Sequence, residues 1–391
     1  MAAPALTIFQ PARPFTLPLT GVAIAIAAWI IVQAEAQMLW MFTIALAMGV
    51  ALYHASYGFS GAYRNFFVRR DTRGIDSQII LLGLTTVLFA PVLSQGSAFG
   101  NVVGGAVAPV GIGMAAGAFL FGIGMQLGGA CASGSLYTAG SGNPRMAIVL
   151  VFFCAGAFWG SLDLAWWQSL PSMPALSLAG EWGWEIALPA QLAMLGLLYF
   201  LLRRYRQQKN RKENTAEDMP LTRRLLRGPW PLIWGGVSLA FLNWLTLVSV
   251  GHPWAITWGF TLWGAKVAAL VGWDPLTSGF WTGGFQQQAL EQPIWRDTTS
   301  VMNLGILAGA TFAMLIGGRK AARWDRRIGP LLAAIVGGLM LGYGARLAYG
   351  CNIGAFISGA ASTSLHGWVW ILCALPGNWI GMKMRRLFWR E

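Results

Sequence analysis

Long apolar runs recur along the whole of this 391-residue chain, and they decide what it can fold into. A helix that spans a bilayer needs about 17–25 predominantly apolar residues. Eleven runs approach that length, near residues 16–34, 38–55, 78–94, 109–127, 146–162, 186–202, 230–250, 254–271, 299–317, 329–345 and 366–382. Only 10% of the residues are charged, against about 25% in a soluble domain. We therefore predict an all-α, multi-pass membrane protein with about 9–11 transmembrane or re-entrant helices.

Basic residues gather at the ends of these apolar runs. Most of the 27 Lys and Arg lie in four clusters: Arg64–Arg73, Arg203–Arg227, Arg319–Arg327 and Lys383–Arg390. Short cytoplasmic loops carry such an excess of basic residues, so we predict an inner (plasma) membrane protein whose linker and C-terminus face the cytoplasm. The net charge of +13 then attracts membrane lipids with anionic head groups. Nucleic acid is not expected as a partner, because no cluster interleaves basic and aromatic residues on a soluble module.

The chain repeats part of its sequence after 220 residues. This shift pairs Cys131 with Cys351 and Trp159 with Trp379, and several glycines fall into the same alignment. Glycines recur by chance in a chain that contains 50 of them, whereas a cysteine and a tryptophan at the same spacing indicate a duplication. Equivalent loops of the two copies carry opposite charge bias, which favours inverted over parallel repeats.

The duplication sets the predicted domain boundaries. Residues 1–202 form the N-terminal membrane repeat, 203–228 a basic cytoplasmic linker, and 229–391 the C-terminal membrane repeat. Such repeats are typical of transporters, whose substrate site lies near the bilayer midplane between them. The Trp-rich stretch 251–273, broken by a Gly-His-Pro sequence, is where we expect a segment that does not fully cross.

Two glycine-rich stretches, GGACASG (128–134) and YGCNIG (349–354), interrupt the apolar runs. Irregular backbone at membrane depth is tolerated only where it is buried in protein or lines a polar cavity. Each stretch is followed by residues that can resume a helix, so two half-helices are expected to point their N-terminal amides at the midplane and attract anions. We predict a substrate path along these Gly-Cys loops, formed by Cys131, Cys351, Gly128, Gly129, Gly350, Ser133 and Asn352.

The thiols of Cys131 and Cys351 suit a small, soft anion. A thiol is a weak hydrogen-bond donor and acceptor, so it can hold a sulfur or selenium centre without trapping it. The alternative is a close-packed glycine crossover in which each cysteine fills a small hole. Cys154 and Cys373 lie inside apolar runs and are expected to be small buried hydrophobic residues.

An isolated arginine, Arg346, lies five residues before Cys351 at the end of a long apolar run. An ionisable side chain inside a membrane segment is a candidate functional residue, and this one is placed to attract an anion toward Cys351. Two other roles stay open, capping the carbonyls of a broken helix and extending to the membrane interface. No metal or other cofactor is expected, because none of the three histidines pairs with a cysteine at ligand spacing.

The chain resembles the YeeE/YedE family of inner-membrane proteins, the sulfur-transport family. The residues that carry the resemblance are FGIGMQLGGACASG (121–134), LGYGARLAYGCNIGAF (341–356) and GFSGAYRNFFVRRDT (58–72). The resemblance implies a permease for thiosulfate or a related sulfur-containing ion, in which Cys131 and Cys351 pass the ion on by transient hydrogen bonds. It also implies that a small cytoplasmic sulfur-carrier protein works with the permease.

One departure from the family pattern concerns a third cysteine. Members usually carry it in a stretch like RFCFTGAFRD, whereas this chain has Gly58 at the cysteine position and Asn65 at the acidic one. The third thiol is therefore absent. Some members are associated with selenium metabolism, so a selenium compound is an alternative cargo.

Two further classes of function compete with transport of a sulfur-containing anion. A membrane thiol oxidoreductase would use Cys131 and Cys351 to exchange electrons, although the chain lacks the close pair of thiols that redox motifs normally have. A structural subunit of a larger sulfur-handling complex is the other possibility. We expect a permease and no enzyme.

Overall fold

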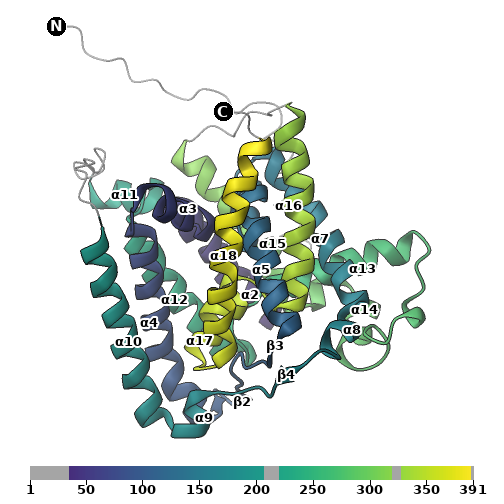
Figure 1. Cartoon of the computed structure of the whole chain (residues 1–391), viewed down its shortest axis with the longest axis horizontal. Helices are drawn as coiled ribbons and strands as arrows, with labels where there is room; N and C mark the ends of the chain where they lie inside the picture. Colours follow the sequence, from purple (N-terminus) through teal and green to yellow (C-terminus); the bar gives the residue numbers. More distant parts are fainter. Residues whose placement is uncertain (1–34, 207–219, 319–326, 389–391) are drawn as a thin grey trace, which may run out of the picture.

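The computed structural model describes residues 35–206, 220–318 and 327–388, and its elements are almost all helical (Figure 1). The predicted run at 16–34 lies outside these residues. The other ten predicted runs each correspond to a helix: α2 (Ala36–Ala55), α4 (Arg73–Gln95), α5 (Ile112–Gly128), α7 (Pro144–Leu162), α10 (Trp184–Tyr205), α12 (Leu232–Val250), α13 (Thr257–Leu270), α15 (Thr298–Gly317), α16 (Ile328–Leu347) and α18 (Leu365–Phe388). The protein is an all-α, multi-pass membrane protein, as predicted.

Eight stretches of the described chain are long and apolar enough to cross a membrane. Three of them, Ala36–Arg69, Ile112–Gly140 and Ile328–Ala361, contain a break between two helices. Helix α13 has only 14 residues, about 21 Å of helix, which is shorter than the hydrocarbon core of a bilayer. It therefore does not cross on its own. Helix α18 has 24 residues and extends along most of the height of the molecule (Figure 1).

Short elements connect these helices. Four two-residue strands form two antiparallel pairs, β1 (Ser97–Ala98) with β2 (Asn101–Val102) and β3 (Val110–Gly111) with β4 (Ser172–Met173). The short helices are α3 (Phe59–Arg69), α6 (Ala132–Gly140), α8 (Leu164–Gln168), α9 (Leu178–Trp182), α11 (Leu221–Arg227), α14 (Gly284–Glu291) and α17 (Ser358–Ala361), with η1 (Pro275–Thr277), η2 (Ile294–Arg296) and η3 (Asn352–Ile357).

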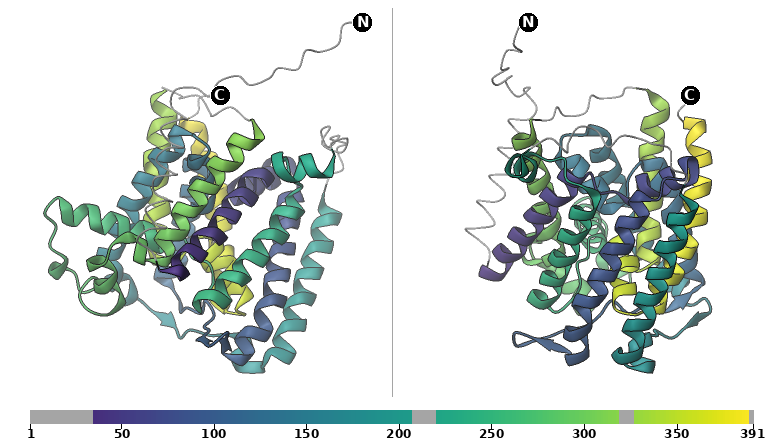
Figure 2. Two further views of the ribbon diagram at one scale, coloured as in Figure 1. Left: turned by 180° about the vertical axis from the view of Figure 1, so that it is seen from behind. Right: turned by 90° about the vertical axis from the view of Figure 1, so that its left-hand side faces the viewer.

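The described residues that flank the basic clusters meet at one end of the molecule. The Arg70 guanidinium lies 5.3 Å from the centroid of the Tyr205 ring, which joins the start of α4 to the end of α10. In the same way the end of α15 lies against α11, and the start of α16 lies against the end of α18. Figure 1 shows α3, α11 and the end of α18 at this end, with α9, β2 and β4 at the other, and Figure 2 shows the same two ends from two further sides. We name these the basic end and the opposite end.

Helices α5 and α16 cross closely in the middle of the molecule and run in opposite directions. A Cβ atom on Gly117 would lie 2.8 Å from the carbonyl oxygen of Gly344, and one on Gly344 would lie 2.6 Å from the carbonyl oxygen of Gly117. Only glycine allows so close an approach of two backbones. Along the same two helices, Gly124 faces Gly337. Helix α7 packs along α16, and α18 packs along α5.

Helices α5 and α16 each end at a break in the backbone. Gly129 caps the end of α5 with a φ of +94°, in the left-handed region, and α6 begins after Cys131. Helix α16 ends at Leu347, and Tyr349 and Gly350 have φ of +60° and +150° before η3 begins. Glycine adopts such angles with little strain at Gly129 and Gly350, whereas Tyr349 is a non-glycine residue in the left-handed region. The chain therefore stops and restarts a helix twice inside the protein.

Candidate functional site

Cys131 and Cys351 each occupy the residue before a new helix begins. Both backbones are extended there, with φ, ψ of −83°, −172° at Cys131 and −107°, −169° at Cys351. Each thiol belongs to a residue that is 1% exposed. The first unpaired amides of a helix point back past its N-cap and carry a partial positive charge. Both cysteines therefore lie where an anion would meet the N-terminus of a half-helix.

The two thiols have similar surroundings. Cys131 Sγ lies 3.4 Å from the hydroxyl oxygen of Ser133 and within hydrogen-bonding reach of the amides of Gly134 and Phe59. Cys351 Sγ lies within reach of the amides of Ile353 and Gly354, and both cysteines belong to the same buried cluster of the core. Both cysteines are free. The structure thus places two buried thiols in one core cluster, each next to backbone N–H donors.

Tyr63 on α3 reaches into this pair. Its hydroxyl accepts a hydrogen bond of 3.3 Å from the side-chain amide of Asn352, and its side chain belongs to the same buried cluster as Cys131. Tyr63 is 3% exposed and Asn352 is fully buried. Two buried oxygens of the site, Asn352 Oδ1 and Ser135 Oγ, have no hydrogen-bond partner within the described ranges. A buried polar oxygen without a partner is costly, so these atoms mark a place where another molecule is expected.

Gly58 lies beside the same thiols. It precedes Phe59, whose amide faces Cys131, and its φ of −147° is accessible to any residue. A Cβ atom on Gly58 would touch only the Tyr137 hydroxyl, at 3.8 Å. Tyr137 lies on α6 and is close to Cys131. The position of the absent third thiol therefore lies next to the residue whose amide faces Cys131 and has room for a side chain.

The three glycines of the predicted path have different surroundings. Gly128 faces Leu341 of α16 and Val149 of α7, and Gly129 lies against the Arg145 guanidinium. Gly350 lies against the amide of Ala355, at the start of the second half-helix. Gly129 and Gly350 therefore lie in the two loops, whereas Gly128 packs against the side chains of α16 and α7.

Among the described residues, no contact joins Arg346 to Cys131 or Cys351. It lies on the last turn of α16, with its Cβ against Gly160 of α7 and its guanidinium carbon 4.8 Å from the centroid of the Phe280 ring. Its Nε is buried without a hydrogen-bond partner in the described chain. Cys154 and Cys373 lie on α7 and α18 and are half-buried.

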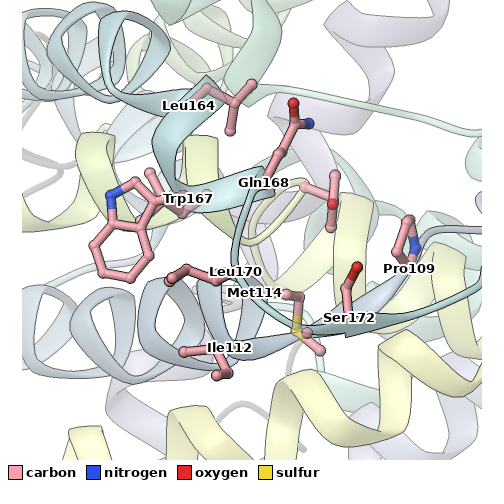
Figure 3. Close-up of a pocket in the computed structure, with 12 residues that line it drawn as sticks. Pro109, Ile112, Met114, Leu164, Trp167, Gln168, Leu170 and Ser172 are labelled. Carbon is pink, nitrogen blue, oxygen red and sulfur yellow. The ribbon is translucent and has the colours of Figure 1, made fainter.

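A cavity of about 190 Å³ opens near the opposite end, close to the Cys351 loop. Figure 3 shows its lining from Pro109 and the start of α5, from α8 with Trp167, and from Ser172. Leu347 and Tyr349 complete it, and Tyr349 is two residues before Cys351. No group of three or more His, Cys, Asp or Glu side chains that could hold a metal ion occurs in the part of the chain that the structure describes.

The sequence missed Tyr63, Phe59 and Tyr137 as neighbours of the thiols. Tyr63 and Phe59 lie in α3, a short helix with no long apolar run, so hydropathy alone did not indicate that it reaches the protein interior. The only available signal was that both lie in a stretch that carries the family resemblance. Tyr137 follows Cys131 by six residues, and helical spacing alone does not decide which way it points.

Comparison with known proteins gives the chain a family. The family model described as sulphur transport matches residues 54–380. The chain is 26% identical over 369 residues to the thiosulfate transporter TsuA of Spirochaeta thermophila, covering 88% of this chain and 97% of that protein. It is also 32% identical over 158 residues to the probable transporter YedE of Escherichia coli, covering 40% of this chain and 38% of that protein.

A second probable transporter YedE, from Salmonella typhimurium, is 34% identical over 137 residues. The chain thus matches little more than a third of the length of the two YedE proteins, and nearly all of TsuA. These relatives are transporters and not enzymes. Because the family model covers most of its length, the protein belongs to the sulphur-transport family, the YeeE/YedE family of membrane transporters.

Proposed function

We propose that the protein carries thiosulfate, or a closely related sulfur-containing anion, across the inner (plasma) membrane past Cys131 and Cys351. The observation that carries the proposal is that two buried thiols in the same core cluster each stand at the start of a half-helix. The similarity to a thiosulfate transporter over nearly the whole chain supports the same substrate. By the positive-inside rule the basic end faces the cytoplasm.

The chemistry of the site suits an ion that must enter and leave. Backbone amides at the two helix starts offset the negative charge of the ion. A neutral thiol donates a weak hydrogen bond to the soft terminal sulfur of thiosulfate and accepts one from a neighbouring group. No covalent bond forms or breaks. Two shallow sites side by side allow the ion to pass from one to the next, whereas a single deep site would hold it.

Tyr63 and Asn352 complete the path in this proposal. Their hydrogen bond connects α3 to the start of η3 beside both thiols. An arriving ion replaces it, because its oxygens can accept from both the Tyr63 hydroxyl and the Asn352 amide. When the ion breaks this bond, the buried oxygens Asn352 Oδ1 and Ser135 Oγ can still accept hydrogen bonds from neighbouring donors.

In this proposal the two halves of the chain are inverted repeats, and the path runs between them. Under the shift of 220 residues Gly117 corresponds to Gly337 and Gly124 to Gly344. The contacts of Gly117 with Gly344 and of Gly124 with Gly337 are then one contact seen twice, as a two-fold axis between antiparallel helices requires. We assign residues 1–202 and 229–391 to the two repeats and 203–228 to the cytoplasmic linker. The cavity beside Tyr349 is the entrance from the outer side.

Other partners follow from the same arrangement. The basic end lies where anionic lipid head groups and a small cytoplasmic sulfur-carrier protein would meet the transporter. A selenium-containing anion has the same soft character as thiosulfate, so it is the second candidate cargo for the two thiols.

Uptake into proteoliposomes tests the proposal. Purified protein is reconstituted, and entry of labelled thiosulfate is compared with that of sulfite, sulfide, selenite and sulfate. We expect thiosulfate to enter fastest and sulfate slowly, since sulfate lacks a soft terminal atom. Selenite entering faster than thiosulfate would replace the sulfur cargo by a selenium one, and no uptake of any of these ions would overturn the transport proposal.

A further inference from the structure

Tyr349 is the residue of the cavity wall that comes nearest in sequence to the thiol of Cys351. It is half-buried and lines the cavity of about 190 Å³ near the opposite end. Gly350 and Cys351 follow it and are buried, and neither is among the described residues that line the cavity. Two residues of chain reach at most about 7 Å. The thiol therefore stands close behind the part of the wall to which Tyr349 belongs.

The backbone of Tyr349 is left-handed, with φ of +60°. Few residues other than glycine adopt this region, and a bulky side chain there is strained. The shift of 220 residues pairs Tyr349 with Gly129, whose φ is +94° and which also lies two residues before a cysteine. Because glycine satisfies the left-handed position in the first repeat, the strain at Tyr349 points to a role for its ring.

A second ring holds the tyrosine ring in place. The imidazole of His366, at the start of α18, meets it edge to face, with ring centroids 6.5 Å apart and an interplanar angle of 86°. His366 is buried, and its Nδ1 lies 2.8 Å from Ser364 Oγ. The Tyr349 hydroxyl forms no hydrogen bond with another residue of the described chain. A ring that is held by packing alone can turn aside without breaking a hydrogen bond.

We infer that the ring of Tyr349 is a size filter between the cavity and Cys351, which turns aside for an ion as small as thiosulfate and keeps bulkier anions out. The inference rests on the proposed transport of thiosulfate and names a residue that determines which anions reach the thiols. By the positive-inside rule the cavity faces the outer side, so the filter acts before the ion meets Cys351. The first repeat has glycine at the equivalent position and no such ring.

Labelling of Cys351 tests the filter without any transport. In a full-length protein whose other three cysteines are replaced by alanine, Cys351 is the only thiol. Sulfonatoethyl methanethiosulfonate, an anionic thiol reagent that does not cross membranes, is added to intact cells. We expect Tyr349→Ala and Tyr349→Gly to speed the labelling about tenfold or more, because access limits the reaction of a buried thiol. Tyr349→Phe keeps the ring and should leave the rate unchanged, as should Gln168→Ala, which alters an exposed residue of the same cavity.

Two outcomes of the labelling would overturn the inference. One is the same rate with and without the ring. The other is labelling of Cys351 behind an intact Tyr349 as fast as that of Phe99→Cys, which stands at a position that is 87% exposed at the opposite end. The second outcome needs no variant of Tyr349. Tyr349→Gly relieves the strained backbone, so it tests the first outcome even if Tyr349→Ala fails to fold.

The choice of anion separates a filter from a purely structural role. Benzenethiosulfonate carries the soft terminal sulfur of thiosulfate, with a benzene ring in place of one oxygen. The ratio of thiosulfate uptake to benzenethiosulfonate uptake into proteoliposomes should fall about tenfold or more in Tyr349→Ala and stay unchanged in Tyr349→Phe. An unchanged ratio in a Tyr349→Ala protein with the melting temperature of wild type would contradict the filter. Wild-type protein that takes up no thiosulfate would overturn the proposed function, whereas the labelling rates would still decide on the filter.

Discussion

The side-chain amide of Asn352 donates a hydrogen bond of 3.3 Å to the hydroxyl of Tyr63. These residues are 289 positions apart in sequence, and their bond connects α3 to the start of the second half-helix beside both thiols. It is a neutral bond in a buried place, so an ion that offers charged oxygens can replace it at modest cost. We propose that this exchange opens the path for its ion.

Tyr63→Phe should slow transport. The substitution removes the hydroxyl that meets the ion and leaves the Asn352 amide without its acceptor, so we expect thiosulfate uptake to fall about tenfold. The matched control is Tyr57→Phe, because Tyr57 is also buried on this side but its hydroxyl lies 3.4 Å from Ser77 Oγ. Uptake rates of both variants in proteoliposomes decide the matter. Equal rates for the two would remove Tyr63 from the path.

Gly58→Cys should fold and transport at least as fast as wild type. The backbone there is extended, and a Cβ atom would touch only the Tyr137 hydroxyl. The new thiol would stand beside the Phe59 amide and Cys131, where it adds a third weak hydrogen-bonding group. Gly58→Ala is the control that fills the space without a thiol. If the cysteine variant transports more slowly than the alanine variant, a third thiol does not assist the ion in this chain.

Gly344→Ala should destabilise the protein. The added methyl group would lie 2.6 Å from the carbonyl oxygen of Gly117 and force α5 away from α16, which we expect to cost about 1–3 kcal/mol. Gly196→Ala, on α10 with nothing within 4 Å, should be neutral or slightly stabilising. Thermal unfolding in detergent compares the two. A melting temperature of the Gly344 variant equal to that of wild type would mean that the helices do not meet at these glycines.

Cysteine labelling in intact cells tests the orientation of the molecule. Leu387 is 75% exposed at the basic end, and Phe99 is 87% exposed at the opposite end. A membrane-impermeant maleimide should label Phe99→Cys in intact cells and Leu387→Cys only after the membrane is opened. Labelling of Leu387→Cys from outside would reverse the orientation and with it the direction of the proposed path.

Hydropathy could predict most of the fold, because burial in lipid demands uninterrupted apolar helices. Ten of the runs are helices, and both Gly-Cys stretches are breaks between helices. The direction of approach of α3 was not predictable, since its 11 residues are too short and polar for a membrane run, although Phe59, Ala62 and Tyr63 share one buried face. Tyr63 therefore entered the site through tertiary packing alone. For the same reason the contact of Arg346 with Phe280, which lies in an irregular turn, had no signal in the sequence.

The role of the paired thiols is the central claim, and the uptake of four single variants tests it most directly. Cys131→Ala and Cys351→Ala should each abolish most thiosulfate uptake in proteoliposomes while the purified proteins keep the melting temperature of wild type within a few degrees. Cys154→Ala and Cys373→Ala change half-buried residues on α7 and α18 and should transport nearly normally. Wild-type rates for both Cys131→Ala and Cys351→Ala would contradict the account and leave the backbone amides and glycines as the path.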